Sequence, residues 1–362
     1  MKKTRLKSRE LFAIVVVVVG FKLADTTPAQ YAQEGQNAFW LMPIISFLVI
    51  FPSFLLLMYL LKKYKDKNLI QLMMIILGRP LGTITGLVVF FIAYGLLIFD
   101  ARNYADQTKL LYFPESPTPV ILVIFLIVTF FGAKRGFQAI GTSTFVTLPY
   151  LKLSVFMLAV LIIQKVVWLR IFPIFGEGLG TILWEGAKRG ATFSDLFIIT
   201  IAYTAFKNGK TFSKGIYFGA LFALFEIVFF FLLYTTLYDY NSIDKTAFPF
   251  HDITQYVNFG EFFTNVETFF MVFWLGAAFL RFIILVYLAS WILGEVLYMD
   301  EFEPFILPLT FFIFPFSLLV ENTILNELVW RNSLFIIATP IFILLPLILW
   351  VTAKAKGDLK KQ

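Results

Sequence analysis

Cysteine is absent from this chain of 362 residues. Its absence excludes disulfides, thiolate metal sites and cysteine nucleophiles. Histidine occurs once, as His251, so no histidine metal cluster and no catalytic arrangement that depends on a histidine base can be assembled. We expect His251 to be a loop residue. No H-E-x-x-H or G-x-S-x-G motif occurs. An enzyme is therefore the weaker class, and we predict no catalytic residue, no cofactor and no metal.

Charged residues are scarce, at 15% of the chain, whereas 59% of the residues are apolar and 46 are phenylalanine. A water-soluble fold of this size could not bury so much apolar surface, so lipid is the natural solvent. Apolar runs recur from residue 11 to residue 352 without a polar domain between them, which predicts one membrane-embedded domain over residues 1–362. The net charge of +7 is held in short clusters beside these runs, which indicates a membrane lipid surface and no nucleic acid as partner.

Windows of about 20 apolar residues, the length that crosses a hydrocarbon core, predict ten transmembrane helices. They lie near residues 11–33, 39–61, 82–104, 117–132, 138–163, 193–207, 214–237, 265–293, 304–320 and 333–352. The fourth and sixth are short, so they must be tilted, thin the membrane locally or be continued by irregular backbone. The connection 164–192 is long enough to form a lid over a vestibule, or else a surface loop with a membrane-lying helix.

Lysine and arginine are unevenly distributed between the loops that these spans define. The loops on the side of the two chain ends hold 19 of them, and the alternate loops, which include Arg331, hold eight. The positive-inside rule therefore predicts that both termini are cytoplasmic. The connection at residues 295–303 carries only acids, which count little in this rule.

The first span is interrupted by the stretch Gly20-Phe-Lys-Leu-Ala-Asp-Thr-Thr-Pro28. Pro28 removes a backbone donor, and hydroxyls beside it can satisfy freed carbonyls or bind a ligand, as in the discontinuous helices of transporters. The alternative is a kinked helix in which Lys22 and Asp25, three residues apart, pair with each other. The ligand-binding candidates of this stretch are Gly20, Lys22, Asp25, Thr26 and Thr27.

Three further charged residues, Lys152, Glu226 and Arg281, lie near the centres of predicted spans. A charge near the bilayer centre costs about 2.5 to 3.5 kcal/mol on insertion scales, so such residues face a cavity or a partner. We predict a buried network that joins the two bases to Glu226 and Asp25. A purely structural set of ion pairs is the alternative.

Gly209-Lys210-Thr211 matches the end of a phosphate-binding loop, but Thr204 stands where that motif requires its first glycine. The stretch also lies between membrane spans. We therefore do not interpret it as a nucleotide-binding loop.

Three stretches carry a resemblance to a known family. They are Asp25-Thr-Thr-Pro28 followed by Gly35-Gln-Asn-Ala-Phe-Trp40, then Pro173-Ile-Phe-Gly-Glu-Gly-Leu-Gly180, and Val266-Glu-Thr-Phe-Phe-Met-Val-Phe-Trp274. With them the chain resembles, from end to end, the B-subunits of spore germination receptors, the spore permease family of the amino acid-polyamine-organocation superfamily. The resemblance implies an all-α integral membrane fold of ten helices, built as two inverted five-helix repeats with broken first and sixth spans. It places the solute site between these breaks and adds Asp195 and Thr200 to the ligand-binding candidates.

Two departures from the family pattern bear on that site. Phe21-Lys22 stands where many relatives have a glycine-rich break, and Tyr203 stands near the place of a proline at the end of the sixth span. The ligand site would therefore be altered or lost. Lys152 is similar in location to a lysine that replaces a sodium ion in some superfamily members, which implies an ion-independent or proton-linked protein.

The resemblance implies a germinant sensor that binds a small nutrient and signals to a membrane A-subunit and a lipoprotein C-subunit in the spore inner membrane. The alternative is an active, proton-linked secondary transporter of an amino acid or other small solute, in which Lys152, Glu226 or Asp25 changes protonation. A structural subunit with a vestigial site is a third class.

Overall fold

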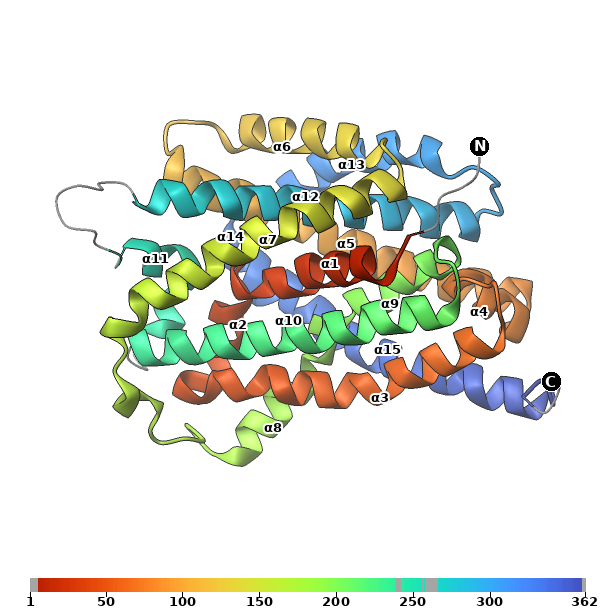
Figure 1. Cartoon of the computed structure of the whole chain (residues 1–362), viewed down its shortest axis with the longest axis horizontal. Helices are drawn as coiled ribbons and strands as arrows, with labels where there is room; N and C mark the ends of the chain where they lie inside the picture. The colour runs from red at the N-terminus through yellow and green to blue at the C-terminus, as the bar shows by residue number, and fades with distance from the viewer. Residues whose placement is uncertain (1–5, 239–241, 256, 258–265, 360–362) are drawn as a thin grey trace.

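The computed structural model describes residues 6–238, 242–255, 257 and 266–359. The regular secondary structure of this part of the chain is helical apart from one isolated bridge between Leu6 and Phe206. The long helices run roughly along the long axis of the molecule (Figure 1). Among the residues that the structure describes, six helical stretches are long and apolar enough to cross a membrane, namely Thr27–Lys63, Arg79–Tyr112, Phe137–Lys165, Gly209–Leu237, Glu267–Val296 and Thr323–Ala355. Three shorter apolar stretches are Thr118–Ala133, Gly190–Ala205 and Glu303–Leu318.

The helices of the first half, with η marking 3-10 turns, are α1 (Ser8–Gly20), η1 (Phe21–Leu23), α2 (Thr27–Gly35), η2 (Gln36–Leu41), α3 (Met42–Lys63), α4 (Leu69–Leu77), α5 (Arg79–Tyr112), α6 (Thr118–Ala133) and α7 (Phe137–Ile162). A connecting region follows with η3 (Ile163–Lys165), η4 (Trp168–Ile171) and α8 (Leu179–Lys188). The second half comprises η5 (Gly190–Phe193), α9 (Asp195–Ile199), η6 (Thr200–Ala205), α10 (Gly209–Leu237), η7 (Ile243–Lys245), α11 (Pro249–Gln255), α12 (Val266–Val296), η9 (Glu303–Phe305), α13 (Ile306–Leu318), α14 (Thr323–Leu325), the π-helix η10 (Asn326–Arg331) and α15 (Asn332–Ala355).

Each of the ten predicted apolar stretches is helical over most of its length, and α7 agrees with the predicted span 138–163 to one residue at each end. The last predicted span, 333–352, begins too late. The helix starts ten residues earlier, at Thr323, because the Asn322 side chain accepts a hydrogen bond from the Leu325 amide at 2.9 Å and caps the first turn.

The two ends of the described chain lie at the same end of the bundle, where α1 begins and α15 ends (Figure 1). An even number of crossings produces this arrangement. The lysines and arginines at positions 1–5 and 360–362, which contributed to the predicted orientation, lie outside the described residues.

Helix α1 is enclosed by the bundle, and every residue from Ala13 to Gly20 is buried. Small residues on α10 allow the close approach of the two helices. A Cβ atom at Gly215 would lie 2.6 Å from the Ser8 carbonyl oxygen, and one at Gly219 would lie 2.7 Å from Val15 Cβ. Ala223 continues the same face of α10 toward Gly20, so this packing sets the depth at which α1 ends.

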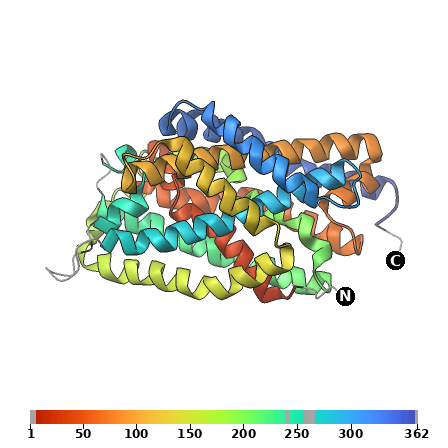
Figure 2. The same ribbon diagram turned by 90° about the horizontal axis from the view of Figure 1, so that it is seen from above.

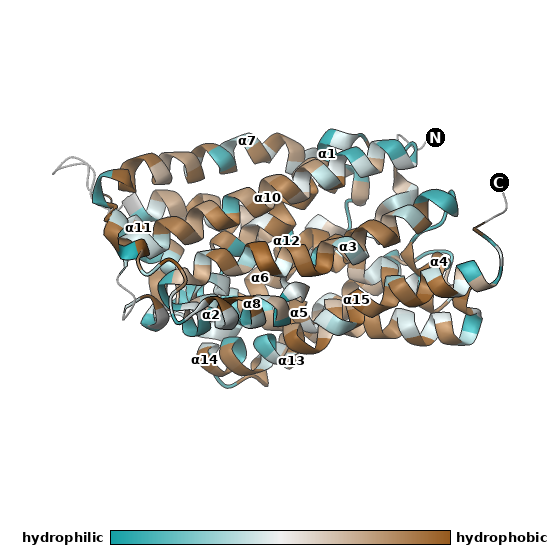
Figure 3. Ribbon diagram, turned by 90° about the horizontal axis from the view of Figure 1, so that it is seen from below, coloured by the Kyte–Doolittle hydropathy of each residue, from teal (hydrophilic) through white to brown (hydrophobic). Residues whose placement is uncertain are grey.

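The outer faces of the helices are apolar. Phe131, Phe156, Phe225 and Phe311 are each more than 60% exposed, as expected for side chains that face lipid. The long helices are hydrophobic for most of their length, with hydrophilic residues gathered toward their two ends (Figure 3). Helices α6 and α13 pack side by side on one side of the molecule (Figures 1 and 2).

Candidate functional site

The predicted interruption of the first span is present. Helix α1 ends at Gly20, a single 3-10 turn follows, and α2 begins at Thr27 with Pro28 in its first turn, where proline is tolerated. The Asp25 carboxylate accepts a hydrogen bond from the Thr27 amide at 2.7 Å. Asp25, one residue before the N-cap Thr26, therefore satisfies the first free amide of α2 where the helix restarts.

The break leaves backbone carbonyls without helical partners, and side chains of α10 and α12 bind them. Tyr234 donates to the Leu23 carbonyl at 2.6 Å, Trp274 donates through Nε1 to the Ala24 carbonyl at 3.0 Å, and Arg281 donates to the Val18 carbonyl. Irregular backbone at membrane depth is stable only when its polar groups are satisfied in this way. Protein side chains thus fill the positions that a bound solute would contact.

A second interrupted helix lies against the first. Residues 190–205 form η5, the five-residue helix α9 and η6. Lys22, from the first break, forms an ion pair with Asp195 at the start of α9, and both side chains are 2% exposed. Thr200 is fully buried, but its hydroxyl donates to the Phe197 carbonyl at 2.6 Å. Of the two candidates in the sixth span, the structure therefore brings Asp195, and not the Thr200 hydroxyl, to the break.

The alternative in which Lys22 pairs with Asp25 is wrong. The 3-10 turn ends at Leu23, and the irregular residues 24–26 after it take Asp25 off the helical face that carries Lys22, which binds Asp195 instead. Asp25 binds Arg331, Oδ2 to Nη2, at 3.0 Å.

The Lys22–Asp195 pair is one end of a continuous buried network. Arg281 lies 3.4 Å from Asp195 and 2.8 Å from Asp100. Arg331 continues the network, at 3.2 Å from Asp100, 3.0 Å from Asp25 and 2.6 Å from Glu327. None of the seven side chains is more than 5% exposed. Three bases face four carboxylates, so the network has one formal negative charge in excess when every group is ionised.

Hydroxyls on the second half of the break contact this network. Thr26 Oγ1 and Thr27 Oγ1 each accept from Arg331 at 3.3 Å. Asn103 of α5 donates to Glu327 at 2.6 Å and to Thr26 at 3.3 Å. The candidates Thr26 and Thr27 are therefore held by the last transmembrane segment rather than open to a solute.

Lys152 and Glu226 form a separate ion pair of 2.7 Å between α7 and α10. A Cβ atom at Gly20 would lie 3.3 Å from Glu226 Oε2 and 3.9 Å from Lys152 Nζ, so the missing side chain of Gly20 lets the pair approach the end of α1. The predicted single network of Lys152, Glu226, Arg281 and Asp25 is thus wrong. Arg281 finds its counter-charges in Asp100 and Asp195, and Asp25 finds its own in Arg331.

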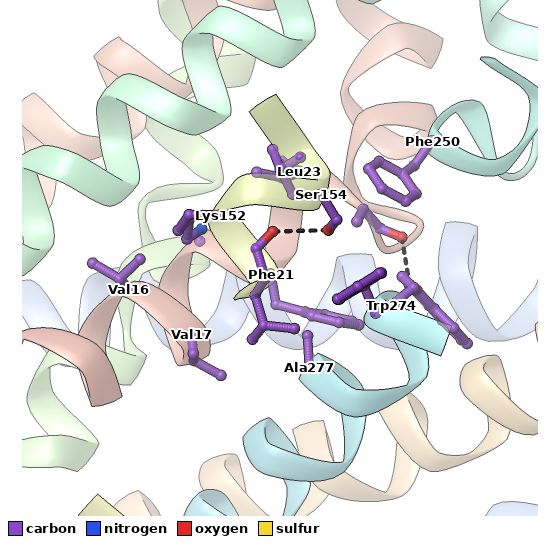
Figure 4. Close-up of a pocket in the computed structure, with 14 residues that line it drawn as sticks. Val16, Val17, Phe21, Leu23, Lys152, Ser154, Phe250, Trp274 and Ala277 are labelled. Atoms are coloured by element: carbon purple, nitrogen blue, oxygen red, sulfur yellow. Dashed lines mark hydrogen bonds between the residues drawn. The ribbon is translucent and has the colours of Figure 1, made fainter. Parts of the chain in front are cut away.

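A small cavity of about 40 Å³ adjoins the first break (Figure 4). Gly20 and Phe21 line it from the break, Lys152 from α7, Phe250 from α11 and Trp274 from α12. In Figure 4, Lys152 lies on one side of the cavity and Phe250 and Trp274 on the other. This volume holds about one or two water molecules and no nutrient of amino-acid size. The site is closed.

Asp100, Asn103, Glu327 and Arg331 were missed from the sequence. Arg331 was counted among the residues of an outer loop, which is wrong, since it is 1% exposed within the bundle. The spacing of Glu327 and Arg331, four residues apart, was the available signal for a helical ion pair. Asp100 and Asn103, three apart in an apolar span, were a second signal.

The connection 164–192 folds against the end of α2. Asn37 donates through Nδ2 to the Pro173 carbonyl at 2.9 Å, and a Cβ at Gly176 would lie 3.1 Å from the Gly35 carbonyl oxygen. Gly176 has a φ of +51°, which favours glycine. Two of the three stretches that carry the family resemblance, 35–40 and 173–180, are therefore in contact.

His251 is not a loop residue. It lies in α11, is 1% exposed, contacts the Tyr112 hydroxyl through Nδ1 at 2.6 Å and packs edge-on against Trp274. The rings of Tyr112, Phe250 and Trp274 surround it, and because Tyr112 and Trp274 come from other helices, the sequence alone did not place His251. Burial lowers the pKa of His251 to about 3 and raises the pKa of the adjacent Asp252 to about 6.

The apolar spans and the two facing helix breaks define a transporter-like, multi-pass membrane protein. The chain belongs to the spore permease family, because the family profile described as spore germination protein matches residues 6–325. The predicted family is thereby confirmed, and it is not an enzyme family.

Two relatives from Bacillus subtilis (strain 168) match part of the chain. The chain is 25% identical over 196 residues to YfkT, which carries the name of a spore germination protein, covering 53% of this chain and 52% of YfkT. It is 24% identical over 195 residues to spore germination protein B2, covering 54% of this chain and 53% of that protein. The matches span about half the length of these curated relatives.

Among solved structures, the chain is similar to Mhp1, a nucleobase-cation-symport-1 family transporter, in a closed conformation with bromovinylhydantoin bound. The TM-score is 0.63, and the match covers 97% of this chain and 94% of Mhp1 at 14% sequence identity. This likeness shows that the chain shares the fold of that transporter.

Proposed function

We propose that this protein is the germinant-sensing subunit of a spore germination receptor, which binds a small nutrient between the two helix breaks and signals to partner subunits. Membership of the spore permease family supports the germination role, and the transporter-like fold supports a solute site within the bundle. By the family resemblance, the partners are a membrane A-subunit and a lipoprotein C-subunit.

The observation that carries the proposal is the Lys22–Asp195 ion pair. It connects the break at residues 21–26 to the interrupted helix at residues 190–205, and it is almost fully buried. A nutrient that binds either charge must replace the other one, because an unpaired charge at membrane depth is expensive. Binding would therefore change the contact between the two breaks.

The size of the cavity indicates how such binding becomes a signal. Because about 40 Å³ admits no nutrient, the nutrient binds a more open arrangement and shifts the population toward it. That change of population is what partner subunits would detect.

The excess negative charge of the buried network suggests which charge the nutrient carries. Four carboxylates and three bases are neutralised by one further positive charge, which an amine on the nutrient or a proton would supply. An amino acid or another amine-bearing nutrient fits this requirement better than an anion.

We further propose that the chain is a single membrane domain of ten spans in two inverted five-helix repeats, with residues 21–26 and 190–205 as the broken first and sixth spans. The shared position of the two chain ends supports cytoplasmic termini, and the family supports the spore inner membrane.

A ligand screen on the purified protein tests the sensor. A nutrient that binds the folded state should stabilise it by about 2.7 kcal/mol at a hundredfold excess over Kd. Asp195→Asn should abolish the shift, whereas Glu185→Gln, which neutralises a buried acid paired with Arg189 outside the breaks, should retain it. A nutrient shift of wild-type size in Asp195→Asn, or unchanged germination kinetics of spores that lack the gene, would contradict the proposal.

An active secondary transporter is the second candidate, and the Lys152–Glu226 pair beside Gly20 favours it. In that mechanism the pair would exchange a proton as the site changes its exposure. Vesicles that contain the protein separate the two functions under an imposed pH gradient. A sensor binds solute without accumulating it, whereas a transporter accumulates solute and loses this activity in Glu226→Gln.

A further inference from the structure

A second cavity lies at the C-terminal end of the second interrupted helix, where Tyr203 and Thr204 of η6 line it. Its lining also includes the end of α3 and the start of α10, which lie at the end of the bundle that holds both chain ends (Figure 1). Its volume is about 530 Å³. It is formed by the loop after α3, the loop after η6 and the first turn of α10. No step of the proposed nutrient response uses it.

The cavity is strongly basic. Lys62, Lys65, Lys207 and Lys210 line it, and Asp66 is the one carboxylate among the residues that line it. The lining therefore has an excess of three positive charges. Four ammonium groups, from the end of α3, the start of α10 and the loops beside them, line one cavity and attract an anion.

The first turn of α10 adds backbone donors to this charge. The Asn208 side chain caps the Thr211 amide at 2.8 Å, which leaves the amides of Gly209 and Lys210 without a partner within the helix. The positive end of a 29-residue helix dipole lies at the same place.

Gly209 is required at this position by a close contact. A Cβ atom there would lie 2.1 Å from the Tyr203 hydroxyl oxygen and 3.1 Å from its Cζ. Without a side chain on Gly209, the Tyr203 ring lies directly against the first turn and forms part of the cavity wall.

Ser213 supplies an independent observation. It lies one helical turn after Gly209, is 6% exposed and lines the cavity, and its hydroxyl has no hydrogen-bond partner within the described residues. A buried hydroxyl without a partner is costly, and rotation of the Ser213 side chain toward a ligand oxygen in the cavity would remove that cost.

We propose that this cavity binds a phosphate group. Lysine ammonium groups, free amides at a helix N-terminus and a hydroxyl are the donors that phosphate oxygens accept. The volume exceeds that of one phosphate, so the rest of the ligand also fits. Two sources carry this chemistry, the headgroup of an anionic phospholipid and a soluble phosphate compound. The site is independent of the nutrient site.

Binding to the full-length protein in nanodiscs distinguishes the sources. In one arm, inorganic pyrophosphate is titrated into protein in phosphatidylcholine nanodiscs, and the thermal unfolding midpoint is followed. In the other arm, phosphatidylglycerol replaces part of the phosphatidylcholine without soluble phosphate, and lipid that remains bound is measured by native mass spectrometry. A raised unfolding midpoint in the first arm, or retained phosphatidylglycerol in the second, supports the site and identifies the kind of phosphate ligand. If neither effect is seen, the proposal is overturned.

Matched variants separate a built site from general charge. The double variant Lys207→Gln/Lys210→Gln should weaken phosphate binding at least tenfold. Lys134→Gln/Arg135→Gln removes the same charge from the exposed connection between α6 and α7 and should leave binding unchanged. Ser213→Ala keeps every charge and should weaken binding about threefold or more. The proposal would be overturned if the two double variants lost the same amount of phosphate affinity. It would also be overturned if Ser213→Ala and Lys207→Gln/Lys210→Gln, measured separately, both bound phosphate as tightly as wild type.

Discussion

Arg331 Nη2 lies 3.0 Å from Asp25 Oδ2, so an arginine that precedes the last helix holds an aspartate in the break of the first one. The two residues are 306 positions apart in the chain. The beginning and the end of the protein are therefore joined at membrane depth by a buried ion pair.

Removing Arg331 should destabilise the fold strongly. Arg331→Met leaves Asp25 and Glu327 without their main counter-charge, which should lower the free energy of unfolding by about 3 to 5 kcal/mol. Unfolding of the purified protein in detergent measures the change. Asp25→Asn combined with Arg331→Met should cost less than the sum of the single variants. Arg9→Met is the control, since the Arg9 side chain of the Arg9–Glu10 pair is 58% exposed, and should cost under about 1 kcal/mol.

A side chain at Gly20 should disturb the Lys152–Glu226 pair. The Cβ atom of Gly20→Ala would lie 3.3 Å from Glu226 Oε2, which forces the carboxylate to move and should cost about 1 to 3 kcal/mol. The nutrient shift in the thermal assay should weaken with it. Gly180→Ala, whose Cβ meets nothing within 4 Å, should change neither quantity. A normal nutrient response in Gly20→Ala would show that the pair is not coupled to the site.

The contact between α1 and α10 should tolerate no added bulk. Gly219→Ala places a Cβ 2.7 Å from Val15 Cβ, and we expect a loss of about 1 to 3 kcal/mol in the free energy of unfolding. Gly276→Ala adds the same atom to α12, where nothing lies within 4 Å, and should be neutral or slightly stabilising. If both variants unfold alike, close packing at Gly219 does not position α1.

His251 should make the protein less stable in acid. Burial lowers its pKa from the usual 6.5 to about 3, so the folded state binds a proton less readily than the unfolded state. The stability from the neutral ring is complete above pH 6.5 and is lost as the pH falls toward 3. Between pH 7 and pH 5 the loss should be about 2 kcal/mol. Unfolding measured at several pH values should show a shallower decline in His251→Asn.

Asp252 should change the stability with pH in the direction opposite to His251. Burial raises its pKa from 3.8 to about 6, so its contribution is complete below pH 3.8 and is lost as the pH rises through 6. Asp252→Asn should therefore make the acid-side decline steeper than in wild type. Parallel pH curves for wild type and both variants would contradict these two assignments.

Sequence patterns predicted the helices better than the contacts between them. A run of about 20 apolar residues has few alternatives to a helix in lipid, and this explains the agreement for Phe137–Ile162. The partner of Lys22 is 173 positions away and depends on how two broken helices cross, which local spacing does not contain. Glu327 and Arg331 were missed because the polar residues around them resemble a loop, although the π-helix buries both.

The backbone carbonyls at the break in the first helix already have hydrogen-bond donors within the protein. Tyr234, Trp274 and Arg281 donate to them. A nutrient gains from these groups only after displacing three protein donors, so much of its intrinsic affinity is lost in opening the site. If the closed form outnumbers the open form by about a hundred to one, the apparent affinity falls about a hundredfold. A sensor of the proposed kind would then respond only above a threshold concentration of nutrient.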